Sequence, residues 1–438
     1  MRVVIGLATA IVATVLLSPS SSLSAADVPA PAEQIVIHDI AEIAKDFRVP
    51  TPEEIARLGT FWPNVPEEEN AAHWFELAAG RLTKEKPPDG SEMGVARPYD
   101  GNAEAFERWV EANRAALDVV REGMRRKAHW TPVVVLDPLK VAMFDIGYFG
   151  RFRALARMVA DEGFLDELSD RPDEAAEKYI DCLRLGMKMR GERTLIEILA
   201  GTSVARGGLR SLDPLIAGGR LGEDTLRMIL QECRLAEVGL YELLAISERE
   251  SAFTKAAMEI YGDIPEVRKQ DELLQRYRAA MTGVLQRRSF EELLRKDVQA
   301  EIENGELKEY KDAGMMAEWP FFPWLVELAR ANVFFRVTEI RAGIALYQKK
   351  HGGALPETLD ALCPAILNSV PIDPFSGKPM RYERTEGGWK VWSAGGDNRD
   401  DGGNSHRTDY ERWDDADAVF VSSMASNLDR KSRKRSAP

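Results

Sequence analysis

Hydrophobic positions recur every three or four residues along most of this chain. Ala71, Trp74, Phe75 and Ala78 share one helical face, and the same spacing continues to about residue 318. A period near 3.6 residues is typical of amphipathic helices. The pattern therefore predicts an α-helical domain over residues 27–318, of which 27–34, rich in Pro and Ala, form a linker.

One helix start within this region is especially clear. Residues 169–173 (Ser-Asp-Arg-Pro-Asp) predict a turn with Pro172 at the first helical position, followed by a helix to Met189. The run from Asp170 to Tyr179 resembles the start of the second helix of a tetratricopeptide repeat. Because no train of such units recurs at 34 residues, two arrangements stay open: helical hairpins packed as in that family, or an irregular helical bundle.

The pattern changes at residues 319–324, where two prolines stand among four aromatic residues. We interpret this segment as a packed junction and a domain boundary. A long helix is predicted from Leu325 to Lys350, ended by Gly352 and Gly353, and a short helix follows in residues 355–362.

Alternation of period two appears only near the C-terminus. Met380–Arg384 and Trp389–Ser393 read as two strands joined by a turn at residues 385–388, and Ala418–Val421 adds a last edge strand. Residues 324–421 are thus predicted to form a small α+β module, and residues 422–438 a disordered, solvated tail. The chain as a whole is predicted to be mostly α.

The order of motifs in about 90 C-terminal residues resembles the globular part of the major pseudopilin of type II secretion. The matching residues are Tyr347, Leu355-Pro356, Leu359, Leu362, Asp373-Pro374-Phe375, Gly377, Pro379, Tyr382, Ser393 and Asp397. The chain departs from that family because no prepilin leader or apolar filament helix precedes Leu325. The resemblance therefore implies the fold of the module and not membership of a filament. The overall design also resembles exported proteins of planctomycete-type bacteria.

The N-terminus predicts export. Arg2 is followed by an apolar run from Val3 to Leu17, and Ser24-Ala25-Ala26 supplies the small residues of a cleavage site after Ala26. This is the pattern of a secretory signal peptide, residues 1–26, and the apolar run is shorter than the roughly 20 residues of a membrane-spanning helix. We expect a soluble mature protein in the periplasm or outside the cell, with association at the cell envelope left open.

Charge and cysteine content narrow the function classes. The formal net charge of −13 argues against nucleic acid as a partner, because phosphate binding needs clustered Lys and Arg. The only dense basic cluster lies within residues 430–435 of the tail. Cys182 and Cys233 fall in apolar helical patterns and are expected to be buried free thiols, although one disulfide among the three cysteines stays open.

The pseudopilin resemblance implies a calcium site in the C-terminal loop. The proposed ligands are Ser393, Asp397, Asp415 and Asp417, with Asp400 and Asp401 in reserve. Calcium prefers six to eight oxygen ligands, and a glycine-rich loop can aim several oxygens inward. The alternative is a solvated acidic loop that binds no metal.

No other motif in the sequence indicates chemistry. The five histidines lack the spacing of a zinc helix, and there is no Cys-x-x-Cys, nucleophile elbow, phosphate-binding loop or dinucleotide motif. We therefore predict a non-enzymatic exported scaffold or interaction protein with protein or peptide partners, and no catalytic residues are assigned. Two alternatives stay open: an exported hydrolase with a site between the two domains, and a component associated with type II secretion.

Overall fold

The computed structural model describes residues 65–83, 103–129, 147–191, 194–260, 265–312, 321–403 and 417–422, together with Glu53. The predicted signal peptide, the linker 27–34, the ligand candidate Asp415 and the basic cluster 430–435 lie outside these ranges. Within them, no helix combines the length and the apolar character needed to cross a bilayer.

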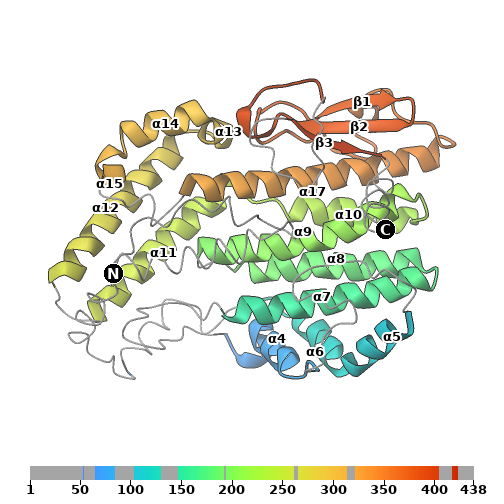
Figure 1. Ribbon diagram of the computed structural model, residues 1–438, viewed down its shortest axis with the longest axis horizontal. Helices are drawn as coiled ribbons and strands as arrows, with labels where there is room; N and C mark the ends of the chain where they lie inside the picture. Colours follow the sequence, from blue (N-terminus) through green and yellow to red (C-terminus); the bar gives the residue numbers. More distant parts are fainter. Residues whose placement is uncertain are drawn as a thin grey trace, which may run out of the picture.

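The first helices of the described part pack against one another in a stack (Figure 1). Their bounds are α4 Ala71–Ala79, α5 Ala103–Ala112, α6 Arg114–Met124, α7 Gly147–Leu168, α8 Pro172–Met189, α9 Leu195–Ala217 and α10 Glu223–Leu235. Helices α4, α5 and α6 pack on one side of α7, and α8 and α9 continue the stack on the other. The mostly helical fold and the start of α8 at Pro172 are as the sequence predicts.

Helices α8 and α9 touch backbone to backbone because glycines face each other at their crossing. A Cβ atom on Gly186 would lie 2.3 Å from the amide nitrogen of Ala205, and one on Gly201 would lie 2.4 Å from the carbonyl oxygen of Gly186. A Cβ on Gly208 would lie 2.6 Å from the Tyr179 carbonyl oxygen. Since interiors are close-packed, these two helices can lie this close only because glycine has no side chain.

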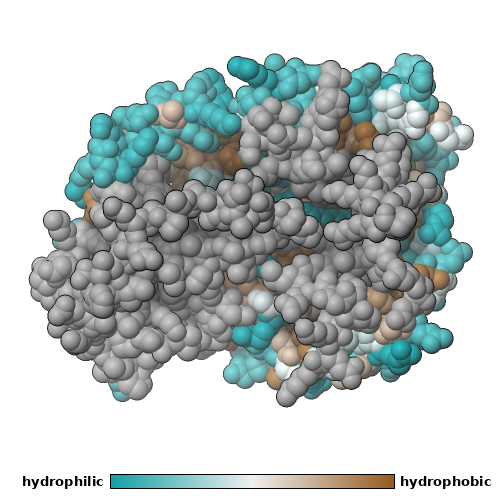
Figure 2. All heavy atoms as spheres, viewed as in Figure 1, coloured by the Kyte–Doolittle hydropathy of each residue, from teal (hydrophilic) through white to brown (hydrophobic). Residues whose placement is uncertain are grey.

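The next helices form a separate arm beside the stack. Their bounds are α11 Leu240–Ile260, α12 Pro265–Arg287, α13 Phe290–Leu294, α14 Lys296–Asn304 and α15 Lys308–Asp312. Residues 296–311 are charged nearly all round in sequence, a pattern that fits either a solvent-exposed bridge or a frayed stretch. The structure shows two short helices that bury Val298, Ile302, Leu307 and Tyr310, and Figure 2 shows the mostly hydrophilic outer face of this arm.

Helix α17, Phe321–Lys350, joins the helical stack to the C-terminal sheet. The sheet is antiparallel with the order β1-β2-β3, formed by β1 Arg381–Thr385, β2 Gly388–Ser393 and β3 Ala418–Val421. Tyr382 pairs with Val391, and Val391 with Phe420. The predicted hairpin and last strand are therefore present, whereas the predicted second helix is a single 3₁₀ turn, η4 Leu359–Leu362.

Buried polar pairs fix α17 to α9 and to the segment that follows α10. The Asn332 side chain accepts from the Val238 backbone N–H at 3.0 Å and donates to the Val238 carbonyl at 2.8 Å. Arg341 and Asp213, both 4% exposed in their side chains, form an ion pair of 2.6 Å. Phe334, seven residues before Arg341 and therefore on the same side of the helix, packs against Phe420 of β3.

Buried residues of the stack, of α17 and of the sheet form one hydrophobic cluster. The boundary proposed at residues 319–324 falls partly on undescribed residues, and Phe321 and Phe322 beside it are buried. The division into two domains stays a prediction, but the module has no core separate from that of the stack.

Candidate functional site

The loop before β1 is organised around the carboxylate of Asp373, which is 0% exposed. Its Oδ1 accepts from the Phe375 backbone N–H at 3.2 Å and from the Ser393 hydroxyl at 2.6 Å. Its Oδ2 accepts from the Ser376 hydroxyl at 2.6 Å and from the Ala394 backbone N–H at 3.0 Å. The carboxylate thus ties the loop 373–377 to the end of β2.

Ser393, the first of the predicted calcium ligands, belongs to this network. Its hydroxyl donates to Asp373 and accepts from the Gly395 backbone N–H at 3.2 Å, and the residue is fully buried. The hydroxyl therefore serves the loop connection, and its main-chain carbonyl is the group left to consider as a metal ligand.

Asp417, just before β3, is also 0% exposed and closes the acidic loop. Its Oδ2 accepts from the backbone N–H groups of Asp401 at 2.9 Å and Gly403 at 2.8 Å. Its Oδ1 is buried and has no hydrogen-bond partner among the described residues. Burial, together with the charges of Asp400 and Asp401, raises the pKa of Asp417 above its usual value although the two N–H groups oppose this.

The remaining acids of the loop bind neighbouring groups. Half-buried Asp397 accepts from the Arg399 backbone N–H at 3.1 Å. Asp400 accepts from the Trp392 indole N–H at 3.0 Å and from Gly402 at 3.1 Å, and it pairs with Arg381. Burial would raise the pKa of Asp400, but these hydrogen bonds and the arginine outweigh burial and lower it.

The structure brings Asp417 and the backbone of residues 401–403 together, and it places Ser393 beside Asp373. Asp415 lies outside the described residues. Within the described ranges, no group of three His, Cys, Asp or Glu side chains is arranged to hold a metal ion. The buried Oδ1 of Asp417 is the feature that fits a cation, because a buried carboxylate oxygen without a partner is costly.

Asp373 is the residue whose importance the sequence did not reveal. In the sequence, Asp373 stands out only as part of the Asp-Pro-Phe motif. The available signal was an Asp followed by Pro, Ser and Gly, residues that favour turns in which the carboxylate binds nearby N–H groups. Its contacts with Ser393 and Ala394, 20 and 21 residues away, leave no local signature.

Acidic side chains in the helical stack bridge neighbouring helices. Glu162 on α7 accepts from Arg114 at 2.9 Å and from Arg121 at 2.6 Å, both on α6. Asp161 accepts from the Trp109 indole N–H of α5 at 3.1 Å, and Glu232 on α10 accepts from Arg184 on α8 at 2.8 Å. These contacts connect neighbouring helices and give the buried carboxylates of the stack hydrogen-bond partners.

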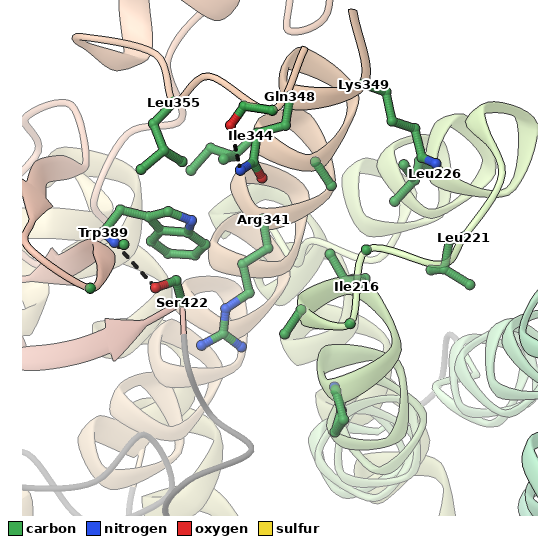
Figure 3. A pocket seen from close by; sticks show the side chains of 18 of the residues that line it. Ile216, Leu221, Leu226, Arg341, Ile344, Gln348, Lys349, Leu355, Trp389 and Ser422 are labelled. Carbon is green, nitrogen blue, oxygen red and sulfur yellow. Dashed lines mark hydrogen bonds between the residues drawn. The ribbon is translucent and has the colours of Figure 1, made fainter. Parts of the chain in front are cut away.

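A groove of about 750 Å³ lies where the helical stack, α17 and the sheet meet. Figure 3 shows Leu355 and Trp389 on one side, Ile216, Leu221 and Leu226 on the other, and α17 between them. Among the described residues, the lining contains no carboxylate.

Comparison of the chain with protein-family models, with curated proteins and with solved structures finds no match in any of the three.

Proposed function

We propose that this chain is an exported, non-enzymatic scaffold that binds protein or peptide partners. One observation supports the proposal: buried pairs such as Arg341–Asp213 and Asn332–Val238 fix α17 to the helical stack, and Phe334 packs against Phe420 of the sheet, so that α17 connects the two parts. Stacked helical hairpins, as in tetratricopeptide repeats, present grooves that accept peptides or partner helices. A type II secretion partner is the special case suggested by the pseudopilin resemblance.

A pull-down separates this function from the hydrolase alternative. The chain lacking residues 1–26, immobilised and exposed to a cell-envelope extract, is expected to retain a defined protein partner in excess over a bare support. Hydrolysis of a polysaccharide or peptide substrate, with no partner retained, would contradict the scaffold proposal. Co-purification of secretion machinery would narrow it to the third alternative.

We also propose that the loop from Ser393 to Asp417 folds around one Ca²⁺ ion. The ligands would be Asp397, Asp415 and Asp417, with the main-chain carbonyl of Ser393. The buried Oδ1 of Asp417 supports this proposal because a cation would supply its missing partner. It would also neutralise the charge whose burial raises the pKa of Asp417.

Calcium is therefore expected to raise the melting temperature of the chain lacking residues 1–26. Binding to the folded form alone adds about 2.7 kcal/mol to the free energy of unfolding at a hundredfold excess over Kd. The measurement compares thermal unfolding in millimolar calcium with unfolding in chelator. Equal melting temperatures in the two buffers would contradict the calcium site and would leave the scaffold role untouched.

Asp417→Asn provides a matched variant. One amide oxygen can still accept from Asp401 and Gly403, whereas the buried charge is removed. In chelator the variant is expected to be at least as stable as the parent at neutral pH. Because the pKa of Asp417 is raised in the folded state, its ionised carboxylate lowers the free energy of unfolding at neutral pH. This penalty decreases as the pH falls through the folded pKa, so the difference in stability between parent and variant should shrink in acid. In calcium the variant should gain little.

A further inference from the structure

The groove has a floor provided by one face of α17. Arg341, Ile344, Ala345, Gln348 and Lys349 follow the helical spacing of three and four residues along that face. The C-terminal turn of α9 forms one wall, and the turn between β1 and β2 forms the other. Three elements far apart in the sequence thus build a single concave site.

Most side chains in the lining are apolar, and the charged ones are all cationic. Ile216, Leu221, Leu226, Ile344, Leu355 and Trp389 provide the apolar part. Arg341 is already paired with Asp213, whereas exposed Lys349 at the rim has no ion pair among the described residues. Lys349 is thus the cation left for a ligand, and the described lining residues include no acid, so the groove is locally complementary to an anion although the chain has a formal net charge of −13.

We propose that this groove binds a free aliphatic carboxylate with a single chain. The chain would lie along Ile344, Leu355 and Trp389, and the carboxylate would pair with Lys349. Pockets for small ligands typically enclose about 300–1,000 Å³, are mainly apolar and carry a few polar groups, and a groove of about 750 Å³ falls in that range. The proposal does not depend on the scaffold role or on calcium.

The first experiment measures binding of laurate, kept below its micelle concentration, by titration calorimetry of the chain lacking residues 1–26. Dodecyltrimethylammonium, which has the same chain and the opposite charge, is the control ligand. Saturable binding of laurate, at least tenfold tighter than that of the ammonium compound, is expected. Equal binding of both, or binding only to vesicles of phosphatidylglycerol, would overturn the proposal.

Two pairs of variants locate the site. Ala345→Phe places a ring in the groove and should weaken laurate binding at least tenfold, whereas Ala354→Phe, at an exposed position outside the lining, should not. Lys349→Glu should weaken it by a similar factor, whereas Lys350→Glu on the same helix, also exposed and outside the lining, should have little effect. Unchanged affinity in both Ala345→Phe and Lys349→Glu would show that laurate binds elsewhere.

Discussion

Replacing Asp373 with asparagine is expected to lower the free energy of unfolding by about 3–5 kcal/mol, despite the equal size of the two side chains. Each carboxylate oxygen accepts one backbone N–H, from Phe375 or from Ala394. Whichever way the amide is turned, its NH₂ group therefore faces a backbone donor. Buried donors without an acceptor cost about 1–3 kcal/mol each, and Arg381, 3.5 Å from Oδ2, loses one of its two counter-charges and keeps only Asp400.

The measurement is the urea midpoint of the chain lacking residues 1–26, taken in chelator so that any calcium effect is absent. Asp397→Ala is the control, because half-buried Asp397 accepts a single backbone N–H in the same loop region. That change should cost no more than about 1 kcal/mol. Similar midpoints for Asp373→Asn and the parent would show that the network does not hold the loop to the sheet.

The second large effect is expected from a single methyl group at the crossing of α8 and α9. Gly186→Ala would place Cβ 2.3 Å from the Ala205 amide nitrogen and 2.5 Å from the Gly201 carbonyl oxygen. Both are backbone atoms, so the helices must separate. Overpacking of this kind costs about 1–3 kcal/mol, and we expect the upper end of that range. The better helix propensity of alanine, about 1 kcal/mol, offsets only part of this cost.

Gly150→Ala is the matched control because the change of residue is the same. Gly150 is exposed in α7, and outside its own helical turn no described atom lies within 4 Å of the position of an added Cβ. Alanine there should stabilise the chain by up to about 1 kcal/mol. Thermal unfolding should thus shift in opposite directions for the two variants. A stabilising Gly186→Ala would mean that α8 and α9 are not in backbone contact.

The local features of the fold could be predicted because short stretches of sequence encode them. Pro172 marks the start of α8, and Gly352 and Gly353, with φ values of +59° and +89°, lie just after α17. The alternation at residues 380–393 predicted the hairpin because successive side chains of a strand face opposite sides. The short helix predicted for residues 355–362, after Gly352 and Gly353, was wrong in extent, since only the 3₁₀ turn η4 forms there.

The charged residues of α17 show where the pattern of the sequence was insufficient. In sequence, Arg336 only interrupts an apolar stretch. In the structure it pairs with Glu237 at 2.6 Å, and Glu339 pairs with Arg234, 105 residues away. Periodicity cannot identify such partners, because it describes only one helix at a time. The loop network of Asp373 and the groove beside Lys349 likewise join segments that are distant in sequence, so periodicity could not predict them.

The sequence by itself determined the mostly helical class, the position of the three-stranded sheet and the acidic character of the loop after β2. These depend on local periodicity and on turn residues. The tertiary structure alone decided that Asp373 accepts a hydrogen bond from the Ser393 hydroxyl and that α17 joins the stack to the sheet. It also decided that Oδ1 of Asp417 has no hydrogen-bond partner among the described residues. These depend on contacts between segments distant in sequence, where burial sets the cost of each unpaired polar group.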